Sequence, residues 1–352
     1  MTLVGIVGAG TMGAGIAQVA LLGGDSVRLH DVDPAAGERA VDRIRAGLHR
    51  SAQRRALQTE AVEAFVDDHL ARLALVPELD DLAPVELAIE AVVEALEPKC
   101  DVVARLDAFL AGDAIIATNT SALSVTAIAR ASRRPERVLG LHFFNPVPVM
   151  RLVEVVAPVG VDRGVVERAT AIVEGWGKVP VHCADTPGFI VNRVNRPFTI
   201  GALRLIEEGA APVETIDGAL RGAGFPMGPF ELMDLTGIDV SLAAATAIWE
   251  GLGRPDRLRP SPIQTSLVAD GHLGRKTGIG FYRYVDGQRI GVAPRFAAPP
   301  VAAAMRGNAI VDRVVRAVRD EAGHAVAEGV ANSAAIDLAL RLGAGHPERP
   351  RG

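Results

Sequence analysis

A short apolar run that leads directly into a glycine-rich turn constrains the fold of this chain more than any other feature. Residues Leu3–Val7 (LVGIV) are typical of a buried strand, and the turn Gly8-Ala-Gly10-Thr-Met-Gly13 follows without a break. An apolar helical pattern, IAQVALL, comes next. In such a unit Gly8 permits the tight turn, Gly10 lets a ligand approach the backbone, and Gly13 lets helix and strand pack closely. This strand, glycine-rich turn and helix therefore predict a parallel, doubly wound α/β domain of the Rossmann type.

The helix after this turn marks a candidate phosphate site. Its N-terminus offers unpaired N–H groups and the positive end of its dipole to a pyrophosphate, so the turn residues, including Thr11 and Met12, are expected to contact it. A second strand, expected over Val27–His30, ends at Asp31, about 20 residues after the turn, where a carboxylate accepts the ribose hydroxyls and repels a 2′-phosphate. Asp33 is also compatible with a surface acid that caps the next turn. The pattern predicts a dinucleotide site that binds NAD rather than NADP.

The first half of the chain alternates short β-branched runs with helical patterns. This alternation predicts a mostly parallel sheet with helices on both faces. A long helical stretch, Pro34–Leu75, reads as an inserted arm, and no strand is expected after Asp185, so a domain boundary is expected near that residue. The expected strands are Leu3–Val7, Val27–His30, Leu87–Ile89, Ile115–Thr118, Val138–His142, Leu152–Val156 and Val179–His182.

The second half contains a repeat with an offset of 120 residues. The segment that starts at Asn192 matches the segment that starts at Asp312, which predicts a duplicated helical unit whose second copy stops early. The expected domains are therefore 1–184 with an arm at about 34–75, a helical domain 185–285, a linker 286–307 that includes the Pro/Ala-rich Ala293–Ala304, and a partial second copy 308–352. The pairs that match are Arg193/Arg313, Glu208/Glu328, Gly209/Gly329, Ile216/Ile336, Asp217/Asp337 and Leu220/Leu340.

Composition excludes several classes of protein. Hydrophobic residues make up 49% and charged residues 22% of the chain, as in a folded globular protein. The net charge of -5, with scattered Lys and Arg, predicts no nucleic-acid partner. Cys100 and Cys183 have the spacing of neither a disulfide framework nor a metal site. With no basic leader and no apolar run of about 18 residues, a cytoplasmic protein without membrane contact is expected.

A histidine and a glutamate twelve residues apart form the candidate catalytic pair. His142 ends one expected strand and Glu154 lies within the next, so both are expected near the carboxyl edge of the sheet, where doubly wound folds bind ligands. A histidine held by a carboxylate is suited to remove a hydroxyl proton as hydride leaves. The alternative is a core histidine and a strand-edge glutamate. The nucleotide motif favours the catalytic interpretation.

Seven segments, in this order, resemble the L-3-hydroxyacyl-CoA dehydrogenase family, in the short form that includes 3-hydroxybutyryl-CoA dehydrogenases. The resemblance covers Leu3 to Tyr284. It implies reversible, NAD-dependent oxidation of an L-3-hydroxyacyl thioester in fatty acid metabolism, by an enzyme that forms a homodimer through its helical domain. The segments are GAGTMGAGIAQV, AVVEALEPK, TNTSALS, HFFNPVPVMRLVEVV, DTPGFIVNRV, GFPMGPFELMDLTGID and GRKTGIGFYRY.

Carried over by position, the resemblance assigns roles to individual residues. His142 is the general base and Glu154 its partner, Ser121 bonds to the reacting 3-oxygen, and Asn192 completes the site from the second domain. Two helix caps are the alternatives, Ser121 for a helix near Ser124 and Asn192 for the helix after GFIV. Asn145, which precedes a proline, can equally be a turn residue. The cofactor contacts that the resemblance adds are Glu94, Lys99, Ser121, Asn145 and Lys276.

The arm departs from the family pattern. The family usually has a lysine-rich run there that holds the carrier end of the substrate, and this chain has HRSAQRR instead. Arg54 and Arg55, with Arg50, can bind phosphate bidentately, but a solvated helix face is an equal interpretation. Ala122 also stands where the family often has a second serine. These differences leave the chemistry intact, and the acyl carrier becomes either coenzyme A or an acyl-carrier protein.

Several features of the sequence disfavour other classes of function. The second copy has Asp312 where the first has Asn192, and it has no counterpart of MGPFEL, so it is expected to carry no active site and to cover apolar surface of the first copy. A non-catalytic NAD-binding protein has no need of Ser121, His142, Glu154 and Asn192 together. The related sugar-acid dehydrogenases are disfavoured, by resemblance, by the intact HFFNPVPVM, and the 3-hydroxyisobutyrate dehydrogenases by the His142–Glu154 pair.

Overall fold

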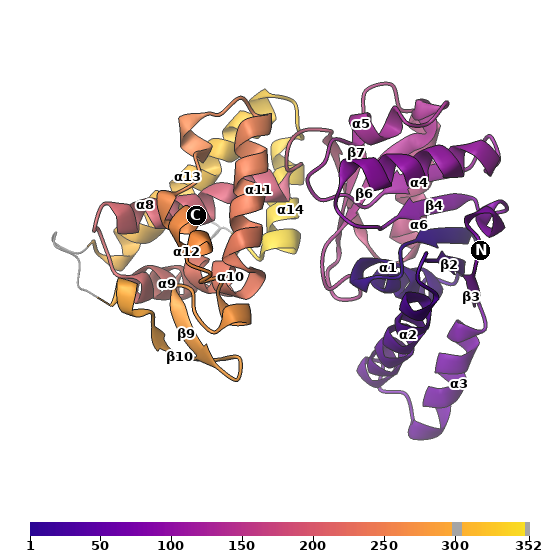
Figure 1. The fold of residues 1–352 in the computed structure, drawn as a ribbon, viewed down its shortest axis with the longest axis horizontal. Coiled ribbons are helices and arrows are strands. Elements are labelled where there is room, and N and C mark those ends of the chain that lie inside the picture. The colour runs from indigo at the N-terminus through magenta and orange to yellow at the C-terminus, as the bar shows by residue number, and fades with distance from the viewer. Residues whose placement is uncertain (298–304, 349–352) are drawn as a thin grey trace. The chain divides into compact units, whose positions relative to one another are not determined.

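The computed structural model describes residues 1–297 and 305–348 of the 352-residue chain. The chain divides into two compact units, Met1–Thr186 and Pro187–Gly352. The first is an α/β unit built on a mostly parallel sheet and the second is helical, so the predicted fold class is confirmed (Figure 1). Among the described residues no single helix is long and apolar enough to cross a membrane, and one pair, bent by 103°, passes that test only jointly.

One eight-stranded sheet forms the centre of the first unit, with the order β3-β2-β1-β4-β5-β6-β7-β8. Strands β1 to β6 are parallel, β7 runs antiparallel to β6, and β8 is parallel to β7. The strand order reverses between β1 and β4, which creates the crevice where doubly wound sheets bind ligands. The strands are β1 Leu3–Val7, β2 Ser26–His30, β3 Leu73–Val76, β4 Leu87–Glu90, β5 Ile115–Thr118, β6 Val138–Phe143, β7 Leu152–Ala157 and β8 Val179–Ala184.

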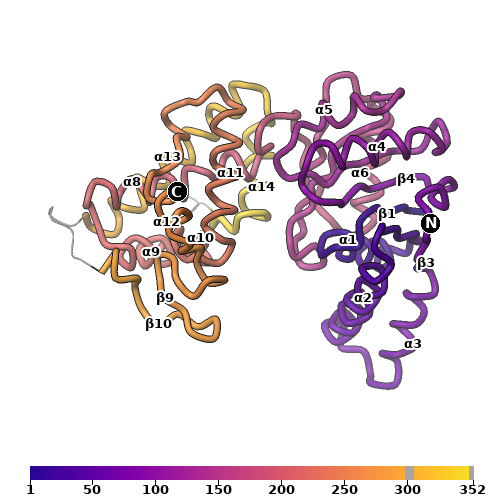
Figure 2. The backbone as a smooth tube through the Cα atoms, viewed as in Figure 1, coloured from indigo at the N-terminus to yellow at the C-terminus, as the bar shows by residue number. Residues whose placement is uncertain are grey.

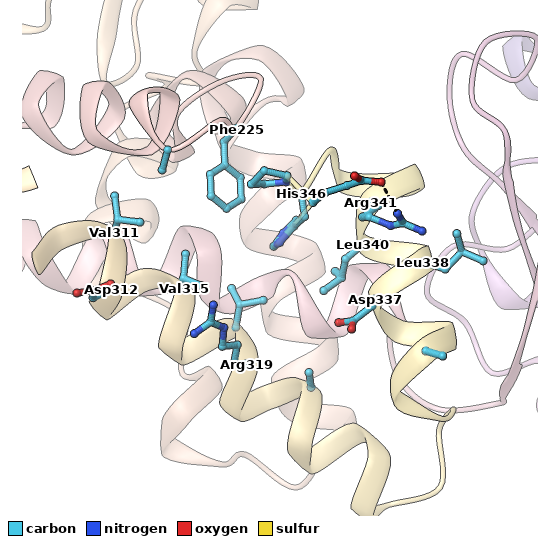
Figure 3. Close-up of a pocket in the computed structure, with 16 residues that line it drawn as sticks. Phe225, Val311, Asp312, Val315, Arg319, Asp337, Leu338, Leu340, Arg341 and His346 are labelled. Carbon is cyan, nitrogen blue, oxygen red and sulfur yellow. Dashed lines mark hydrogen bonds and ion pairs between the residues drawn. The ribbon is translucent and has the colours of Figure 1, made fainter. Parts of the chain in front are cut away.

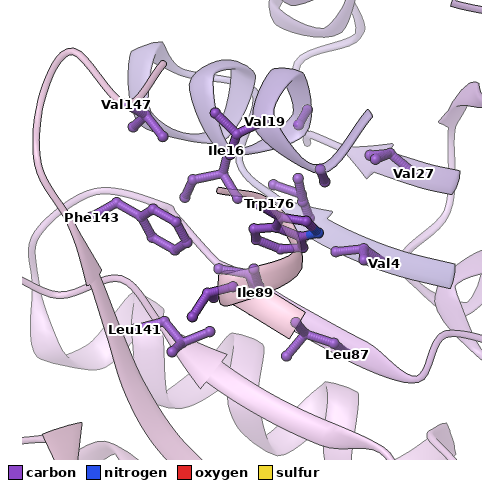
Figure 4. Close-up of a cluster of buried hydrophobic side chains, with 14 of the residues drawn as sticks. Val4, Ile16, Val19, Val27, Leu87, Ile89, Leu141, Phe143, Val147 and Trp176 are labelled. Carbon is purple, nitrogen blue, oxygen red and sulfur yellow. The ribbon is translucent and has the colours of Figure 1, made fainter. Parts of the chain in front are cut away.

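Helices cover both faces of this sheet, because successive strand residues point to opposite sides. On one face the helices α1, α2 and α6 pack around Trp176, whose indole N–H donates to Asp25 at 2.8 Å (Figure 4). On the other face α4, α5 and η1 cover a second apolar cluster. The elements are α1 Thr11–Leu22, α2 Pro34–Arg54, α3 Thr59–Leu70, α4 Leu96–Phe109, α5 Val125–Ala129, α6 Arg163–Gly175, and the 3₁₀ turns η1 Leu79–Leu82 and η2 Pro135–Arg137.

The predicted arm is real but shorter than expected. It is a pair of packed helices, α2 and α3, separated by a break at residues 55–58. The prediction is wrong at its C-terminal end, because Leu73–Val76 forms β3 and pairs in parallel with β2. The apolar face of α2, including Ile44 and Leu48, is buried in the core of the sheet domain, and Figure 1 shows the two helices extending away from the sheet.

The second unit is helical, as predicted, with one exception. The expectation that no strand follows residue 185 is wrong at an antiparallel hairpin, β9 Tyr282–Val285 and β10 Gln288–Val292. The expected linker 286–307 therefore contains a strand, and its residues 298–304 lie outside the described residues. The helices are α7 Val191–Val194, α8 Arg196–Glu207, α9 Val213–Gly222, α10 Pro229–Thr236, α11 Ile238–Gly251, α12 Pro262–Ala269, α13 Gly307–Ala327 and α14 Ser333–Ala344, with 3₁₀ turns η3 Asp256–Leu258, η4 Arg275–Thr277 and η5 Pro294–Phe296.

The two copies of the sequence repeat have the same local structure. Helices α8 and α9 of the first copy correspond to α13 and α14 of the second, and Gly209 and Gly329 end the first helix of each copy with φ of 65° and 73°. The copies pack on each other through α13, which contacts α8 and α9. Reciprocal ion pairs join them: Arg193 pairs with Glu328 at 2.8 Å, and Arg313 pairs with Glu208. The contact thus has approximate two-fold symmetry.

Candidate active site

The glycine turn after β1 leaves room for a bound phosphate. Gly8 has a φ of +105°, and a Cβ there would lie 2.6 Å from the carbonyl oxygen of Ala91, which follows β4. A Cβ on Gly13 would lie 1.8 Å from the oxygen of Gly8. Around Gly10, by contrast, a Cβ would meet no atom within 4 Å. The turn is therefore closely packed at Gly8 and Gly13 and open at Gly10, as the approach of a pyrophosphate to the start of α1 requires.

Asp31 lies at the carboxyl end of β2, beside this turn. Its carboxylate accepts hydrogen bonds from the backbone N–H of Ala9 at 2.6 Å and of Asp33 at 2.9 Å. The side chain is therefore held against the glycine turn at the carboxyl ends of β1 and β2, where an acid accepts from the ribose of a dinucleotide in this fold. Asp33 has the other expected role, since it caps α2 by accepting from Ala35 at 3.0 Å. The exposed Thr11 and half-buried Met12 begin α1.

His142 and Glu154 face each other on neighbouring strands. They are direct cross-strand partners in the antiparallel β6–β7 pair, and Nδ1 of the histidine lies 2.6 Å from Oε2 of the glutamate. Both are buried, with exposed fractions of 5% and 0%. An imidazole that donates from Nδ1 to a carboxylate carries its lone pair on Nε2, and the carboxylate stabilises the imidazolium that forms when Nε2 takes a proton. The pair is thus arranged as a general base.

A neighbouring thiol is kept out of this chemistry. Cys183 lies on β8, which pairs with the strand of Glu154. Burial, together with the negative charges of Glu154 and Asp185, raises the pKa of the Cys183 thiol well above its usual value. Because the thiolate is the reactive form of cysteine, Cys183 is inert at neutral pH.

Ser121 lies three residues beyond the carboxyl end of β5, the strand next to β6. The Oε1 atom of Glu94 holds this loop, because it accepts from the backbone N–H of Ser121 at 2.7 Å, its hydroxyl at 3.1 Å and the hydroxyl of Thr120 at 2.7 Å. Burial acts to raise the pKa of Glu94, but the charge of Lys99 and these hydrogen bonds outweigh it and hold the pKa below its usual value. Glu94 is therefore a carboxylate that orients Ser121.

Behind Glu94 lies a buried ion pair that the sequence analysis did not identify. Lys99 is 1% exposed, and its Nζ lies 2.8 Å from Glu90 and 3.1 Å from Glu94. Glu90, at the end of β4, is fully buried and also accepts from the hydroxyl of Thr118 at 2.6 Å and the N–H of Val92 at 2.7 Å. Lys99 was predicted to contact the cofactor. The structure places its amine between two carboxylates, and its contact with the cofactor stays a prediction.

The alternative roles of Ser121 and Asn192 as helix caps are wrong. Ser124, not Ser121, is the N-cap of α5, where it accepts from Ala127 at 3.2 Å. Asp185 reinforces that cap by accepting from Val125 at 3.0 Å and Thr126 at 2.7 Å. Asn192 lies inside the short helix α7, and Ile190 is at the N-cap position.

The loop after β6 carries Asn145, whose peptide bond to Pro146 is cis. Asn145 is exposed in a bend, as the turn interpretation expects. A buried lysine that the sequence analysis did not single out holds the loop: Lys178 donates to the carbonyl oxygens of Val147 and, at 2.8 Å, Met150. Burial lowers the pKa of the Lys178 amine to about 8. Its position just before β8 gave no signal of this role.

The remaining predicted residues belong to the second unit or to the arm. Asn192 and Lys276 belong to the second unit, where Lys276 pairs with Asp239 at 2.6 Å, and their contacts with substrate and cofactor stay predictions. On the arm, Arg54 donates to Ser51 at 3.0 Å and Arg55 lies over the ring of Phe65, 5.4 Å from its centroid. Both guanidinium groups are on exposed residues at the C-terminal end of α2.

A dinucleotide turn and a buried histidine–carboxylate pair at one edge of the sheet together indicate an NAD-dependent dehydrogenase. Two family models match the chain: the 3-hydroxyacyl-CoA dehydrogenase NAD-binding domain over residues 3–186, and the C-terminal domain of the same enzymes over residues 188–284. The chain belongs to the 3-hydroxyacyl-CoA dehydrogenase family.

Relatives of known sequence and structure agree with this family. The chain is 47% identical to the 3-hydroxyadipyl-CoA dehydrogenase of Escherichia coli over 79% of its own length, although it spans only 58% of that protein. It is 42% identical to human mitochondrial hydroxyacyl-coenzyme A dehydrogenase, over 79% of this chain and 90% of the relative. The crystal structure of 3-hydroxybutyryl-CoA dehydrogenase from Escherichia coli matches with a TM-score of 0.88 at 35% identity, over 98% of this chain and 89% of that one.

A second solved structure matches less of the chain. The (S)-3-hydroxybutyryl-CoA dehydrogenase from Ralstonia eutropha has a TM-score of 0.77 at 36% identity and is covered completely, but it covers 81% of this chain. The Escherichia coli structure covers almost the whole chain and so extends into the second helical copy.

Proposed function

We propose that the chain catalyses the reversible, NAD-dependent oxidation of an L-3-hydroxyacyl-CoA to the 3-oxoacyl-CoA. The observation that carries the proposal is the buried His142–Glu154 pair, 2.6 Å apart, at the same sheet edge as the open glycine turn. The names of the relatives support coenzyme A thioesters as the substrate class, since they are named dehydrogenases of 3-hydroxyadipyl-CoA, hydroxyacyl-coenzyme A and 3-hydroxybutyryl-CoA.

The proton step belongs to the histidine. As the C3–H bond transfers its electron pair as hydride, the O–H proton passes to Nε2 of His142 and the C3–O bond becomes a carbonyl. Nδ1 keeps its hydrogen bond to Glu154, whose charge offsets the charge of the imidazolium. In the reverse direction the same Nε2 returns the proton to the carbonyl oxygen. The fully buried Glu154 fixes the tautomer and the ring orientation.

The cofactor residues fit NAD. The turn Gly8 to Gly13 and the start of α1 would hold the pyrophosphate, and Asp31 would accept from the adenosine ribose. When bound, NAD supplies the hydride acceptor. Ser121, oriented by Glu94, is proposed to donate to the 3-oxygen of the substrate, and Asn192 is proposed to contribute from the second unit.

The decisive assay is NADH oxidation, followed by its absorbance, with acetoacetyl-CoA as the substrate. The proposal requires turnover with NADH that falls when NADPH replaces it. Absence of turnover by a protein that binds NADH in a titration would contradict it and leave the non-catalytic interpretation.

The exposed arginines of the arm favour a second candidate for the acyl carrier. Arg50, Arg54 and Arg55 stand at the end of α2, where phosphate of either coenzyme A or the prosthetic group of an acyl-carrier protein can bind. The two carriers are distinguished by comparing kcat/KM for acetoacetyl-CoA and for the acetoacetyl carrier protein. Equal values of kcat/KM would count against an acyl-carrier protein as the specific carrier.

Three further properties are proposals from the resemblance: a role in fatty acid metabolism, a cytoplasmic location and a homodimer. The second helical copy restricts which surface a homodimer can use. It covers α8 and α9 of the first copy through reciprocal ion pairs, so that surface is already occupied within one chain. A homodimer therefore has to use another face, and sedimentation at several protein concentrations tests whether one forms.

A further inference from the structure

One arginine of the second unit carries a charge that the proposed reaction does not use. Arg196 is half-buried at the start of α8, directly after the short helix α7, and its Nε is buried without a hydrogen-bond partner. Among the residues that the structure describes, its guanidinium group makes no hydrogen bond or ion pair. Burial alone lowers the pKa of this group to about 10, so it is still charged at neutral pH. The folded chain thus holds a cation without a counter-ion.

Other arginines of the same unit are treated differently. Arg193, which is fully buried, pairs with Glu321 and with Glu328, both at 2.8 Å. Arg316, the counterpart of Arg196 at the 120-residue offset of the repeat, is exposed to water. Removing a charge from water without a counter-ion is unfavourable, and a charged group in such a position is a candidate for a functional site. A bound anion would supply the partner that Arg196 does not have within the described chain.

Arg196 shares a side of its helix with Asn192, the proposed catalytic residue. Asn195 between them has helical backbone angles, φ of −82° and ψ of −6°, so Arg196 follows Asn192 by one helical turn. Long side chains on a helix lean toward its N-terminus, which is the direction of Asn192. Both residues are half-buried. The guanidinium group is therefore placed beside the turn that carries Asn192.

The second copy covers a different side of this helix. A Cβ on Gly201 would lie 3.9 Å from Val314 of α13, and Figure 2 shows α8 beside α13. At about 100° per residue, Arg196 lies about 140° around the helix from Gly201. Next to Arg196, Oδ1 of Asn195 lies 2.8 Å from Nε2 of His346, which lines a pocket of about 820 Å³ in the second copy (Figure 3). Asn195 is thus held by the second copy and Arg196 is not.

The position of Arg196 selects the kind of anion. This step rests on the proposed function, in which Asn192 contributes at the 3-oxygen of the acyl group. Four residues of helix rise about 6 Å, so the guanidinium group reaches atoms close to C3 of the substrate. The pantetheine arm next to the thioester is uncharged, and the phosphates of coenzyme A are at its far end. The anion within reach is therefore a carboxylate on the acyl chain itself.

We propose that Arg196 binds a carboxylate at the far end of the acyl chain, so that the preferred substrate is the thioester of a dicarboxylic acid. The planar guanidinium group can donate two parallel N–H bonds to such a carboxylate. An acyl chain that ends in a methyl group would instead remove water from the cation without replacing it. Arg196 acts as a specificity-determining residue, and the hydride and proton steps at C3 are unchanged.

A matched pair of substrates tests this specificity. L-3-hydroxyadipyl-CoA and L-3-hydroxyhexanoyl-CoA have acyl chains of equal length, and the first has a carboxylate where the second has a methyl group. The value of kcat/KM for each is measured from the formation of NADH. Wild type should prefer the dicarboxylic substrate by about tenfold to hundredfold, the size expected for hydrogen bonds to a charged group.

Two variants, checked for folding by circular dichroism, assign the preference to one side chain. Arg196→Met should lower kcat/KM for the dicarboxylic substrate and raise it for the hexanoyl substrate, because the cation is replaced by an apolar group. A gain on one substrate cannot come from a folding defect. Arg204→Met is the matched control on the same helix, since Arg204 donates to the backbone carbonyls of Asp256 and Arg257. The ratio of the two kcat/KM values should remain that of wild type in this control.

A preference that Arg196→Met loses and Arg204→Met keeps supports the proposal. Equal kcat/KM values for the two substrates in wild type overturn it, and so does a ratio that Arg196→Met leaves unchanged; the dehydrogenase activity itself stands in both cases. If wild type oxidises neither substrate, the proposed function fails instead. Calorimetric titration with adipyl-CoA and hexanoyl-CoA, which have no 3-hydroxyl group, then decides the proposal separately. Equal Kd values for these two thioesters would overturn it, and tighter binding of adipyl-CoA that depends on Arg196 would support it.

Discussion

Replacing Lys99 by methionine isolates the buried charge network behind the Ser121 loop. Methionine keeps most of the apolar stem and removes the ammonium group, which lies 2.8 Å from Glu90 and 3.1 Å from Glu94. Glu90 is fully buried, so the substitution leaves a carboxylate in the interior with only its hydrogen bonds from Thr118 and Val92. Breaking a buried pair in this way costs about 3–5 kcal/mol, so we expect a loss of that size in the free energy of unfolding.

Urea unfolding followed by circular dichroism measures the loss as a lower midpoint at an unchanged m-value. Two controls define its origin. Glu90→Gln combined with Lys99→Met removes both charges and should recover much of the stability. Lys178→Met also removes a buried ammonium group, but this group donates only to backbone carbonyls, so no carboxylate is left behind and a loss of about 1–3 kcal/mol is expected.

The same variant distinguishes two roles of Lys99 in the site. If Lys99 acts through Glu94, its loss releases the carboxylate that orients Ser121. The value of kcat should then fall by a larger factor than the Kd for NAD rises. If Lys99 contacts the cofactor, the Kd for NAD should rise instead. A Lys99→Met variant within about 1 kcal/mol of wild type, with unchanged kcat, would refute the argument that this ion pair supports the loop.

Four further substitutions test other parts of the site. His142→Gln should lower kcat by about two to four powers of ten with NAD binding near normal. An unchanged kcat would contradict the assignment of His142 as the general base. Asp31→Ala should reduce the preference for NAD over NADP in kcat/KM; an unchanged ratio would place the ribose elsewhere. Gly13→Ala puts a Cβ 1.8 Å from a backbone oxygen and should abolish saturable NADH binding, which fluorescence titration detects. Burial raises the pKa of Asp217 from 3.8 to about 7, so the folded chain holds a proton there that the unfolded chain releases. The contribution of this proton to the free energy of unfolding is complete below about pH 4 and is lost as the pH rises through about 7, by up to about 4 kcal/mol. Unfolding midpoints should therefore fall more steeply between about pH 5 and pH 8 in wild type than in Asp217→Asn.

His346, which follows the C-terminal end of α14, changes stability with pH in the opposite direction to Asp217. Burial lowers the pKa of His346 from 6.5 to about 4, so the unfolded chain binds a proton in this interval that the folded chain does not, and stability rises with pH up to about 6.5. Subtracting the Asp217→Asn profile from the wild-type profile removes this contribution and leaves that of Asp217.

The sheet was predictable because its strands are short, apolar and separated by helical patterns. The strand that was missed, β3, follows α3 after only two residues, so LALV reads as the end of the helical pattern. The missed hairpin did carry a signal. Asp286 and Gly287 connect β9 to β10 with φ of 49° and 73°, and Asp-Gly between alternating residues is a strong indication of a two-residue hairpin turn.

The candidate site was predictable only where one motif contains the interacting groups. His142 and Glu154 lie in consecutive strands, so strand alternation places both on one face and the antiparallel register brings them together. Glu90 and Lys178 could not be found in this way. Lys178 donates to backbone carbonyls, and Glu90 pairs with Lys99 of α4 and accepts from Thr118 of β5. Nothing in the local sequence distinguishes a buried glutamate at the end of β4 or a buried lysine before β8 from surface residues.

The repeat shows why a duplicated sequence need not duplicate a function. Arg193 and Glu328, with Arg313 and Glu208, hold the copies together symmetrically, so the residues at this contact are retained in both. Asn192, a proposed catalytic residue, corresponds to Asp312 in the second copy. The proposed chemistry is therefore not expected in that copy. Arg341 aligns with Arg221, and each arginine has a carboxylate partner close to it in the chain, Glu348 for Arg341 and Glu231 for Arg221, so this local ion pair is retained although the helix that follows α9 has no counterpart among the described residues.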